Sequence, residues 1–317
     1  MGTFIESWIG RVLFSMISFI AFLGNISVIW IFIRKRKLYT KKPFDVFIVN
    51  LAIADLATAV FLIFSRFLYL PTMPDSQPEA FFLCNLLWGG YILFGLGYVS
   101  VYTCLLLTIE RWLALNKPHL YRRLKAKHAI FSIIIVWIWA FFINSTVFIS
   151  INENFQKRKC EWIEPKVGKA AFPVLELSFA CVIPFSIIIA LYCHIFYKFN
   201  RMATFSVDTQ AVFKKRITIV ALVASIALIV GWFPAKISFI LRFTSVGGSH
   251  LSGTAHFIFV MMGLGNSCVN PILYGIYSSK FRQEYKEIAY GILSKKCTTN
   301  VNTDVKEESE VQTVELT

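Results

Sequence analysis

Ionisable side chains inside long apolar runs are the residues of this sequence most able to do chemistry. Asp55 interrupts one such run, and the pair Glu110-Arg111 ends another. A carboxylate in the middle of a membrane costs about 2.5–3.5 kcal/mol to insert, so it normally faces the protein interior and has partners. An Arg at a membrane edge can pair with its neighbouring acid and still reach water. These residues therefore indicate charges that find their partners inside the protein or at the membrane edge.

Three further charges stand near the ends of apolar runs: Arg66, Glu176 and Lys236. Glu176 and Lys236 either pair with each other or bind a charged group from outside the chain, and the sequence leaves both interpretations open. Catalysis is not predicted, because the five His residues are scattered and the sequence has no metal-binding cluster or nucleophile triad. We therefore predict that the chain is not an enzyme.

Hydropathy predicts the elements that position these charges. The 317 residues are 56% hydrophobic and 16% charged, whereas soluble domains carry about 25% charged residues. About 20 apolar residues cross a membrane as a helix. Runs of this kind lie near residues 8–33, 43–70, 83–109, 129–150, 171–197, 217–241 and 252–277. We predict an all-α membrane protein, a seven-transmembrane helix bundle.

The basic residues predict how the bundle is oriented. Segments after the first, third, fifth and seventh runs hold 23 of the 32 Lys and Arg residues. Because cytoplasmic loops are enriched in these residues, the N-terminus is expected outside the cell and the C-terminus inside. The net charge of +14 is then a signal of topology. Nucleic-acid binding is not expected, since the charges are divided among short loops.

Several motifs resemble those of rhodopsin-like (class A) G-protein-coupled receptors. The second run contains Leu51-Ala52-Ile53-Ala54-Asp55, the third ends in Glu110-Arg111-Trp112, and the seventh contains Asn270-Pro271-Ile272-Leu273-Tyr274. The basic segment Lys157-Arg158-Lys159 and the seventh run look closest to the neuropeptide-receptor branch. The resemblance implies a receptor domain over residues 1–293, in the plasma membrane. The tail over residues 294–317 is polar enough to be disordered, and we expect it to be cytoplasmic.

Two cysteines stand on the expected outer face, Cys84 and Cys160, and the other five lie in spans or on the cytosolic side. Disulfides persist in oxidising compartments, and the family joins its third helix to its second outer loop, so a Cys84–Cys160 bond is expected. Arg111 follows Cys84 by 27 residues, which is longer than the resemblance leads us to expect. The excess predicts a bulge or an extra partial turn.

The resemblance also implies a set of activation residues. The family's Arg is a latch, held by its neighbouring acid at rest, and its sixth helix bends at a Trp-x-Pro sequence. Here Gly231 and Leu228 replace the usual Cys and Phe near that sequence, and Lys214 stands where a second acid often lies. The implied switch residues are Glu110, Arg111, Tyr192, Trp232, Pro234, Asn270, Pro271 and Tyr274.

No cofactor is expected beyond an allosteric sodium ion. The resemblance places a buried Na⁺ site at Asp55, Ser100, Asn266, Ser267 and Asn270. Beyond the seventh run, residues 278–288 have Phe281, Tyr285 and Ile288 on one face and charges largely elsewhere, which predicts an amphipathic helix at the membrane surface. Cys297 lies near that surface and is a candidate for palmitoylation.

The ligand is predicted from the charges near the outer ends of the spans. The resemblance places Arg66, Glu176, Lys236 and Trp232 at the ligand cavity, which would suit a peptide with charged and aromatic groups. A small anionic or lipid ligand is the alternative, and a transporter or channel is a less favoured one. The implied partners are a heterotrimeric G protein, arrestin and a receptor kinase through the tail, and membrane lipid.

Overall fold

The computed structural model describes residues 8–34, 42–67, 75–156, 158–162, 171–202, 209–243, 253–277, 281–288 and 290. These belong to two compact units, Met1–Ile272 and Leu273–Thr317. Seven helical stretches of the described chain are long and apolar enough to cross a membrane, which confirms the predicted bundle. They are Ile9–Arg34, Pro43–Phe64, Gln77–Asn116, Ala126–Ser150, Val174–Phe199, Thr218–Leu241 and Thr254–Tyr277.

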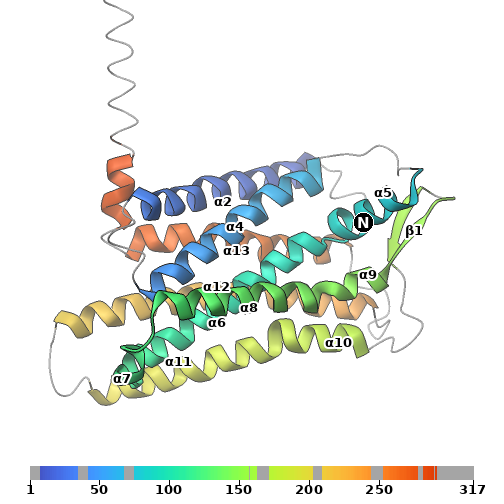
Figure 1. Cartoon of the computed structure of the whole chain (residues 1–317). Helices are drawn as coiled ribbons and strands as arrows, with labels where there is room; N and C mark the ends of the chain where they lie inside the picture. The colour runs from blue at the N-terminus through green and yellow to red at the C-terminus, as the bar shows by residue number, and fades with distance from the viewer. Residues whose placement is uncertain are drawn as a thin grey trace, which may run out of the picture. The chain divides into compact units, whose positions relative to one another are not determined.

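Figure 1 shows the long helices lying side by side, with some spans divided into shorter elements. Two helices extend beyond the predicted runs, because helical hydrogen bonding continues into residues that are too polar to register as membrane-spanning. The third stretch begins at Gln77 and the sixth helix at Thr209. The helices are α2 (Trp8–Arg34), α4 (Pro43–Phe67), α5 (Gln77–Phe82), η1 (Leu83–Trp88), α6 (Tyr91–Asn116), α7 (Pro118–Tyr121), α8 (Ala126–Ile143), η2 (Asn144–Thr146), α9 (Val147–Ser150), α10 (Ala171–Leu177), η3 (Ser178–Val182), α11 (Ile183–Met202), α12 (Thr209–Phe243) and α13 (Gly253–Tyr277).

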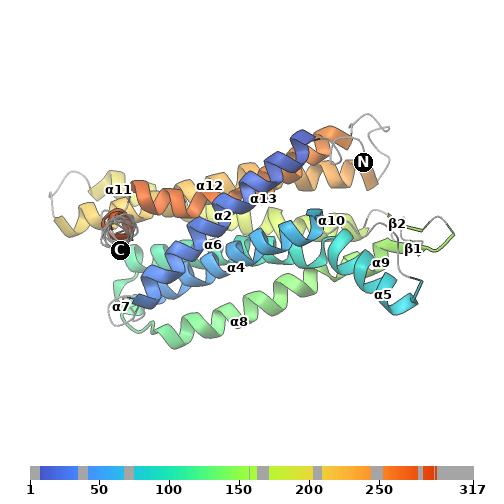
Figure 2. The same ribbon diagram turned by 90° about the horizontal axis from the view of Figure 1, so that it is seen from above.

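Helix α6 lies at the centre of the bundle. It contacts α4, α8, α11 and α12, and the stretch that contains it is the most buried of the seven. Figure 2 shows α6 between neighbouring helices in the view from above. Large apolar side chains on α2 and α8, such as Phe19 and Phe131, are exposed instead. In a membrane these side chains face lipid, so the exposed apolar surface is consistent with a spanning bundle.

A wide turn precedes α6 and accounts for the long Cys84–Arg111 spacing. Residues Leu83–Trp88 form a π-helical turn, and Gly90 then adopts a left-handed conformation with φ of 76°. Only Gly reaches that region without steric cost. A π turn holds one more residue than an α turn, so extra chain is absorbed here before α6 begins. The predicted bulge is confirmed.

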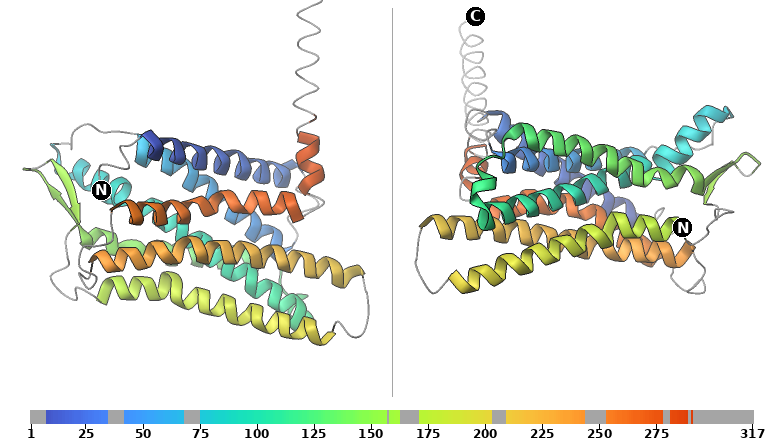
Figure 3. Two further views of the ribbon diagram at one scale, coloured as in Figure 1. Left: turned by 180° about the vertical axis from the view of Figure 1, so that it is seen from behind. Right: turned by 60° about the horizontal axis from the view of Figure 1, so that its bottom comes forward.

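The loop between the fourth and fifth spanning stretches forms a short antiparallel hairpin. Strand β1 (Ile151–Asn154) pairs with β2 (Lys159–Trp162), with Glu153 opposite Cys160. Figure 3 shows this hairpin projecting beyond the end of α9. Cys160 is disulfide-bonded to Cys84, with a Cα–Cα distance of 5.4 Å. The predicted bond is confirmed, and it fixes the hairpin to the start of the third spanning stretch.

In the second unit, residues 281–288 are helical. Phe281 is buried, and its ring lies 6.1 Å from that of Tyr285. The expected apolar face is therefore present, but Glu284 is also buried, with 6% exposure. The tail 294–317 and Cys297 lie outside the described residues.

Candidate functional site

A cavity lies among the helices that carry the predicted ligand residues. Its empty space, including the mouth, is about 450 Å³. The structure brings together Glu176, Lys236 and Trp232 at this cavity, as predicted, whereas the side chain of Arg66 lies outside the described set. The lining residues are Phe94, Asn144, Thr146, Val147, Ser150, Glu176, Trp232, Ala235, Lys236, Phe239, His256 and Val260.

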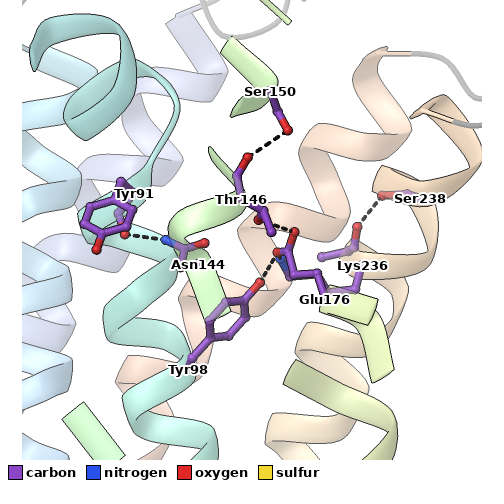
Figure 4. A network of polar contacts seen from close by, with 9 residues as sticks. Tyr91, Tyr98, Asn144, Thr146, Ser150, Glu176, Lys236 and Ser238 are labelled. Atoms are coloured by element: carbon purple, nitrogen blue, oxygen red, sulfur yellow. Dashed lines mark hydrogen bonds and ion pairs between the residues drawn. The ribbon is translucent and has the colours of Figure 1, made fainter. Parts of the chain in front are cut away.

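Glu176 and Lys236 form a buried ion pair, as the first of the two interpretations of these charges predicts. Lys236 Nζ lies 2.6 Å from Glu176 Oε1, and both side chains are 9% exposed. The carboxylate also accepts hydrogen bonds from the Tyr98 hydroxyl and from Thr146 Oγ1, the latter at 3.1 Å. Figure 4 shows these groups converging from α6, η2, α10 and α12. A buried pair needs such additional bonds to offset its desolvation.

Aromatic rings surround the cation of this pair. Lys236 Nζ lies 4.6 Å from the ring centroid of Tyr98, 5.2 Å from that of Phe94 and 5.7 Å from that of Phe239. A cation within about 6 Å of an aromatic face is attracted by the ring quadrupole. The cavity therefore holds a positive charge in an apolar setting, balanced by one carboxylate.

Trp232 lies one helical turn before Lys236 on α12. It is buried, and its ring lies 6.1 Å from Phe94 and 6.4 Å from Tyr98. A Cβ atom at Gly97 would overlap the indole, so the absence of a side chain there admits the ring. Pro234 lies inside α12. A proline cannot donate to the carbonyl four residues earlier, here that of Val230, so the weak point of the helix lies in the turn that contains Trp232.

A second polar cluster surrounds Asp55, which is 1% exposed. Its Oδ1 accepts hydrogen bonds from Ser100 Oγ at 3.0 Å and Ser267 Oγ at 3.2 Å, and its Oδ2 accepts one from Asn270 Nδ2 at 2.7 Å. Among the described residues, no cationic side chain pairs with Asp55. The Asn266 side chain is buried, and its Oδ1 has no hydrogen-bond partner among them.

This cluster fits a small hard cation. Carboxylate, hydroxyl and amide oxygens are the ligands that such cations prefer, and a buried carboxylate without a counter-charge is costly. The unsatisfied Asn266 oxygen supplies one further acceptor in the set predicted from the sequence. Asp55, Ser100, Asn266, Ser267 and Asn270 are the residues that would hold the ion.

At the other end of α6, Arg111 is paired with Glu110 through two hydrogen bonds. Arg111 Nη2 donates to Glu110 Oε1 at 2.6 Å and Nε to Oε2 at 2.5 Å. Both residues are buried, and the guanidinium lies 4.1 Å from the ring centroid of Phe44. Burial raises the pKa of Tyr121 on α7 to about 12, and the Glu110 carboxylate adds to the rise. The protonated phenol can donate a hydrogen bond to Glu110.

Three other predicted switch residues, Tyr192, Pro271 and Tyr274, have different surroundings from the Glu110–Arg111 pair. The Tyr192 hydroxyl is buried and has no hydrogen-bond partner within the described part of the chain. Pro271 packs near Gly24, where an added Cβ would lie 2.8 Å from the proline ring. Tyr274 belongs to the second unit, where its ring lies 5.3 Å from that of Phe281.

Sequence reasoning missed the neutral groups that complete each site. Tyr98 and Thr146 bind Glu176, and Tyr121 lies at the Glu110–Arg111 pair. It also missed a buried chain in which Trp137 donates to Asn50 and Asn50 donates to Thr103, at 2.9 and 2.8 Å. The sequence signal that could have found these groups is the presence of polar residues at helical spacing inside apolar runs.

Comparison with known proteins agrees with this arrangement. Residues 24–274 match the family model of the 7 transmembrane receptor (rhodopsin family). The chain is 25% identical to galanin receptor 2a of Danio rerio over 90% of this chain and 78% of that receptor. It is 24% identical to the allatostatin-A receptor of Bombyx mori, over 91% and 82%.

Hormone receptors are also similar, but over a smaller part of their length. The chain is 26% identical to the follicle-stimulating hormone receptor of Cairina moschata over 87% of this chain and 39% of that receptor. The family consists of receptors, which confirms that the chain is not an enzyme. The chain is a multi-pass membrane protein and belongs to the rhodopsin family of seven-transmembrane receptors.

Proposed function

We propose that this receptor binds an extracellular peptide and activates heterotrimeric G proteins at the plasma membrane, with its N-terminus outside and its C-terminus in the cytosol. The observation that carries the proposal is the cavity that holds the Glu176–Lys236 pair among aromatic rings. It offers a peptide both polar and aromatic contacts. Similarity to galanin and allatostatin-A receptors supports a peptide ligand, and the basic segments support the orientation.

The other partners follow from the same proposal. Arrestin and a receptor kinase would act on the tail 294–317, and membrane lipid would contact the helix at 281–288, with Cys297 palmitoylated. Asp55 would hold an allosteric sodium ion. A small anionic or lipid ligand is the second candidate, and the observation that favours it is the Lys236 cation in an apolar setting.

The test is a neuropeptide library applied to cells that express the receptor, with G-protein nucleotide exchange as the readout. We expect at least one peptide to raise exchange in the wild type and none to do so in Arg111→Ala at equal surface expression. Ion flux that persists in cells lacking G proteins would instead support a transporter or channel. A response restricted to fatty acids or small organic anions would replace the peptide with the second candidate.

A further inference from the structure

We propose that the cavity contains a binding site for an uncharged amide group, with Lys236 as its donor and Asn144 as its acceptor. The inference rests on the proposed function only for the assumption that this cavity receives the ligand. It concerns the chemical class of the group that binds there.

Lys236 has hydrogen-bonding capacity to spare. An ammonium group has three N–H donors, and among the described residues Glu176 is the only acceptor that Lys236 bonds. The three rings around it attract the charge but do not replace hydrogen bonds to oxygen. Glu176 is better satisfied, because it accepts from Lys236, Tyr98 and Thr146. An oxygen atom from a ligand can therefore bind Lys236 without displacing Glu176.

Asn144 complements Lys236, because it has an acceptor without a hydrogen-bond donor among the described residues. The residue is 1% exposed and lines the cavity. Its Nδ2 donates to the Tyr91 carbonyl at 2.5 Å, whereas its Oδ1 is buried and has no partner within the described chain. Figure 4 shows the Asn144 nitrogen directed toward Tyr91 and its oxygen toward the side of Thr146 and Glu176. A buried acceptor that is left unpaired is costly, so this oxygen favours a ligand N–H.

Electroneutrality selects an amide over a carboxylate. The Glu176–Lys236 pair has no net charge, and a ligand carboxylate that reached Lys236 would also approach Glu176 and be repelled. A carboxylate also cannot donate to Asn144 Oδ1. An amide supplies an acceptor oxygen and a donor nitrogen in one planar group. Phe94, Trp232 and Phe239 line the same cavity and suit an aromatic side chain next to that amide.

Two sources carry this chemistry: a backbone amide within a peptide and a primary carboxamide at a peptide's C-terminus. The probes are N-acetyl-phenylalanine amide, its N-methylamide and the free acid N-acetyl-phenylalanine, each at millimolar concentration with the purified full-length receptor. The readout is the thermal unfolding midpoint, which a ligand of the folded state raises. This readout needs no G protein, so its outcome is independent of the signalling test.

We expect the amide probes to raise the midpoint by about 2–4 °C, where a stabilisation of this size is measurable, and the free acid to do less. A larger shift with the primary amide identifies a C-terminal carboxamide, and equal shifts identify a backbone amide. A free acid that stabilises most, or no shift with either amide, overturns the proposal.

Variants locate the effect. Lys236→Met alone would leave Glu176 unpaired in a buried place, so the informative variant is Glu176→Gln with Lys236→Met, which removes both charges. Asn144→Ala removes the acceptor without changing any charge. Both should lose the shift, and Ser132→Ala should keep it, because Ser132 does not line the cavity and its hydroxyl bonds the His128 carbonyl of its own helix, α8. A shift that survives in either of the first two shows binding elsewhere and overturns the assignment.

Discussion

Glu110 and Arg111 are adjacent in sequence, and their side chains satisfy one another in a buried place. Motif matching predicted this pair, and it predicted the donors to Asp55, because charged and amide groups inside apolar runs must find partners. It did not predict Tyr121 or Thr146 as partners. A hydroxyl is compatible with many environments, so only the fold shows which hydroxyls meet a buried carboxylate.

We predict that Glu110→Gln raises ligand-free signalling. Neutralising the acid weakens the bond that holds Arg111, and a charge-assisted bond is worth about 1.5–3 kcal/mol. That difference changes the population of a minor active state about tenfold or more. Basal G-protein nucleotide exchange at equal surface expression measures the effect.

Glu161→Gln is the matched control for Glu110→Gln. Glu161 accepts a hydrogen bond from Asn154 within the β1–β2 hairpin, far along the chain from Arg111, and its variant should leave basal exchange unchanged. Basal exchange that stays at the wild-type level in Glu110→Gln would contradict the latch.

The sequence predicted which segments of this receptor are helices, but it predicted less well the residues at which they begin and end. Hydropathy located all seven spans, but it did not show that α12 begins at Thr209 or that the loop between the fourth and fifth spans is a hairpin. Short strands outside a membrane have no apolar run to mark them. The spacing between Cys84 and Arg111 did predict the wide turn at η1, since a fixed span cannot absorb extra residues in a regular helix.

The disulfide gives a prediction at this scale. Cys84 and Cys160 are separated by 76 residues, and a crosslink across such a loop typically contributes about 2–4 kcal/mol. Cys84→Ser should therefore lower the thermal unfolding midpoint of the purified receptor, and a reductant should have the same effect on the wild type. Cys193→Ser, at a free exposed cysteine of α11, should be neutral. If the unfolding midpoint of Cys84→Ser equals that of the wild type, the disulfide does not stabilise the fold.

At the scale of the whole bundle, Asp55 joins helices that are distant in sequence. Its carboxylate connects α4 to Ser100 of α6 and to Ser267 and Asn270 of α13. Asn25 of α2 donates to the Ser267 carbonyl at 2.9 Å and joins a fourth helix. Composition predicted that the chain is a membrane bundle, and motifs predicted this cluster, because a buried carboxylate restricts its neighbours to polar groups.

We expect sodium to stabilise the folded receptor through this cluster. At a concentration ten times the dissociation constant, a bound ion contributes about 1.4 kcal/mol, or about 3–5 °C in the unfolding midpoint. The midpoint in sodium chloride should exceed that in N-methylglucamine chloride of equal ionic strength, and Asp55→Asn should abolish the difference. Ser225→Ala, whose hydroxyl bonds its own helix, should preserve it. Identical midpoints for the wild type in both salts would argue against the ion.

The wide turn at η1 has a consequence for how this receptor is aligned with its relatives. Because the extra residues lie before Tyr91, α6 is regular from Tyr91 to Arg111. Residue equivalence along this helix must therefore be counted backward from Arg111. Counting forward from Cys84 shifts the register of Phe94 and Tyr98 and assigns cavity positions to side chains on the wrong face. A ligand pharmacophore transferred from a relative would then be built on the wrong residues.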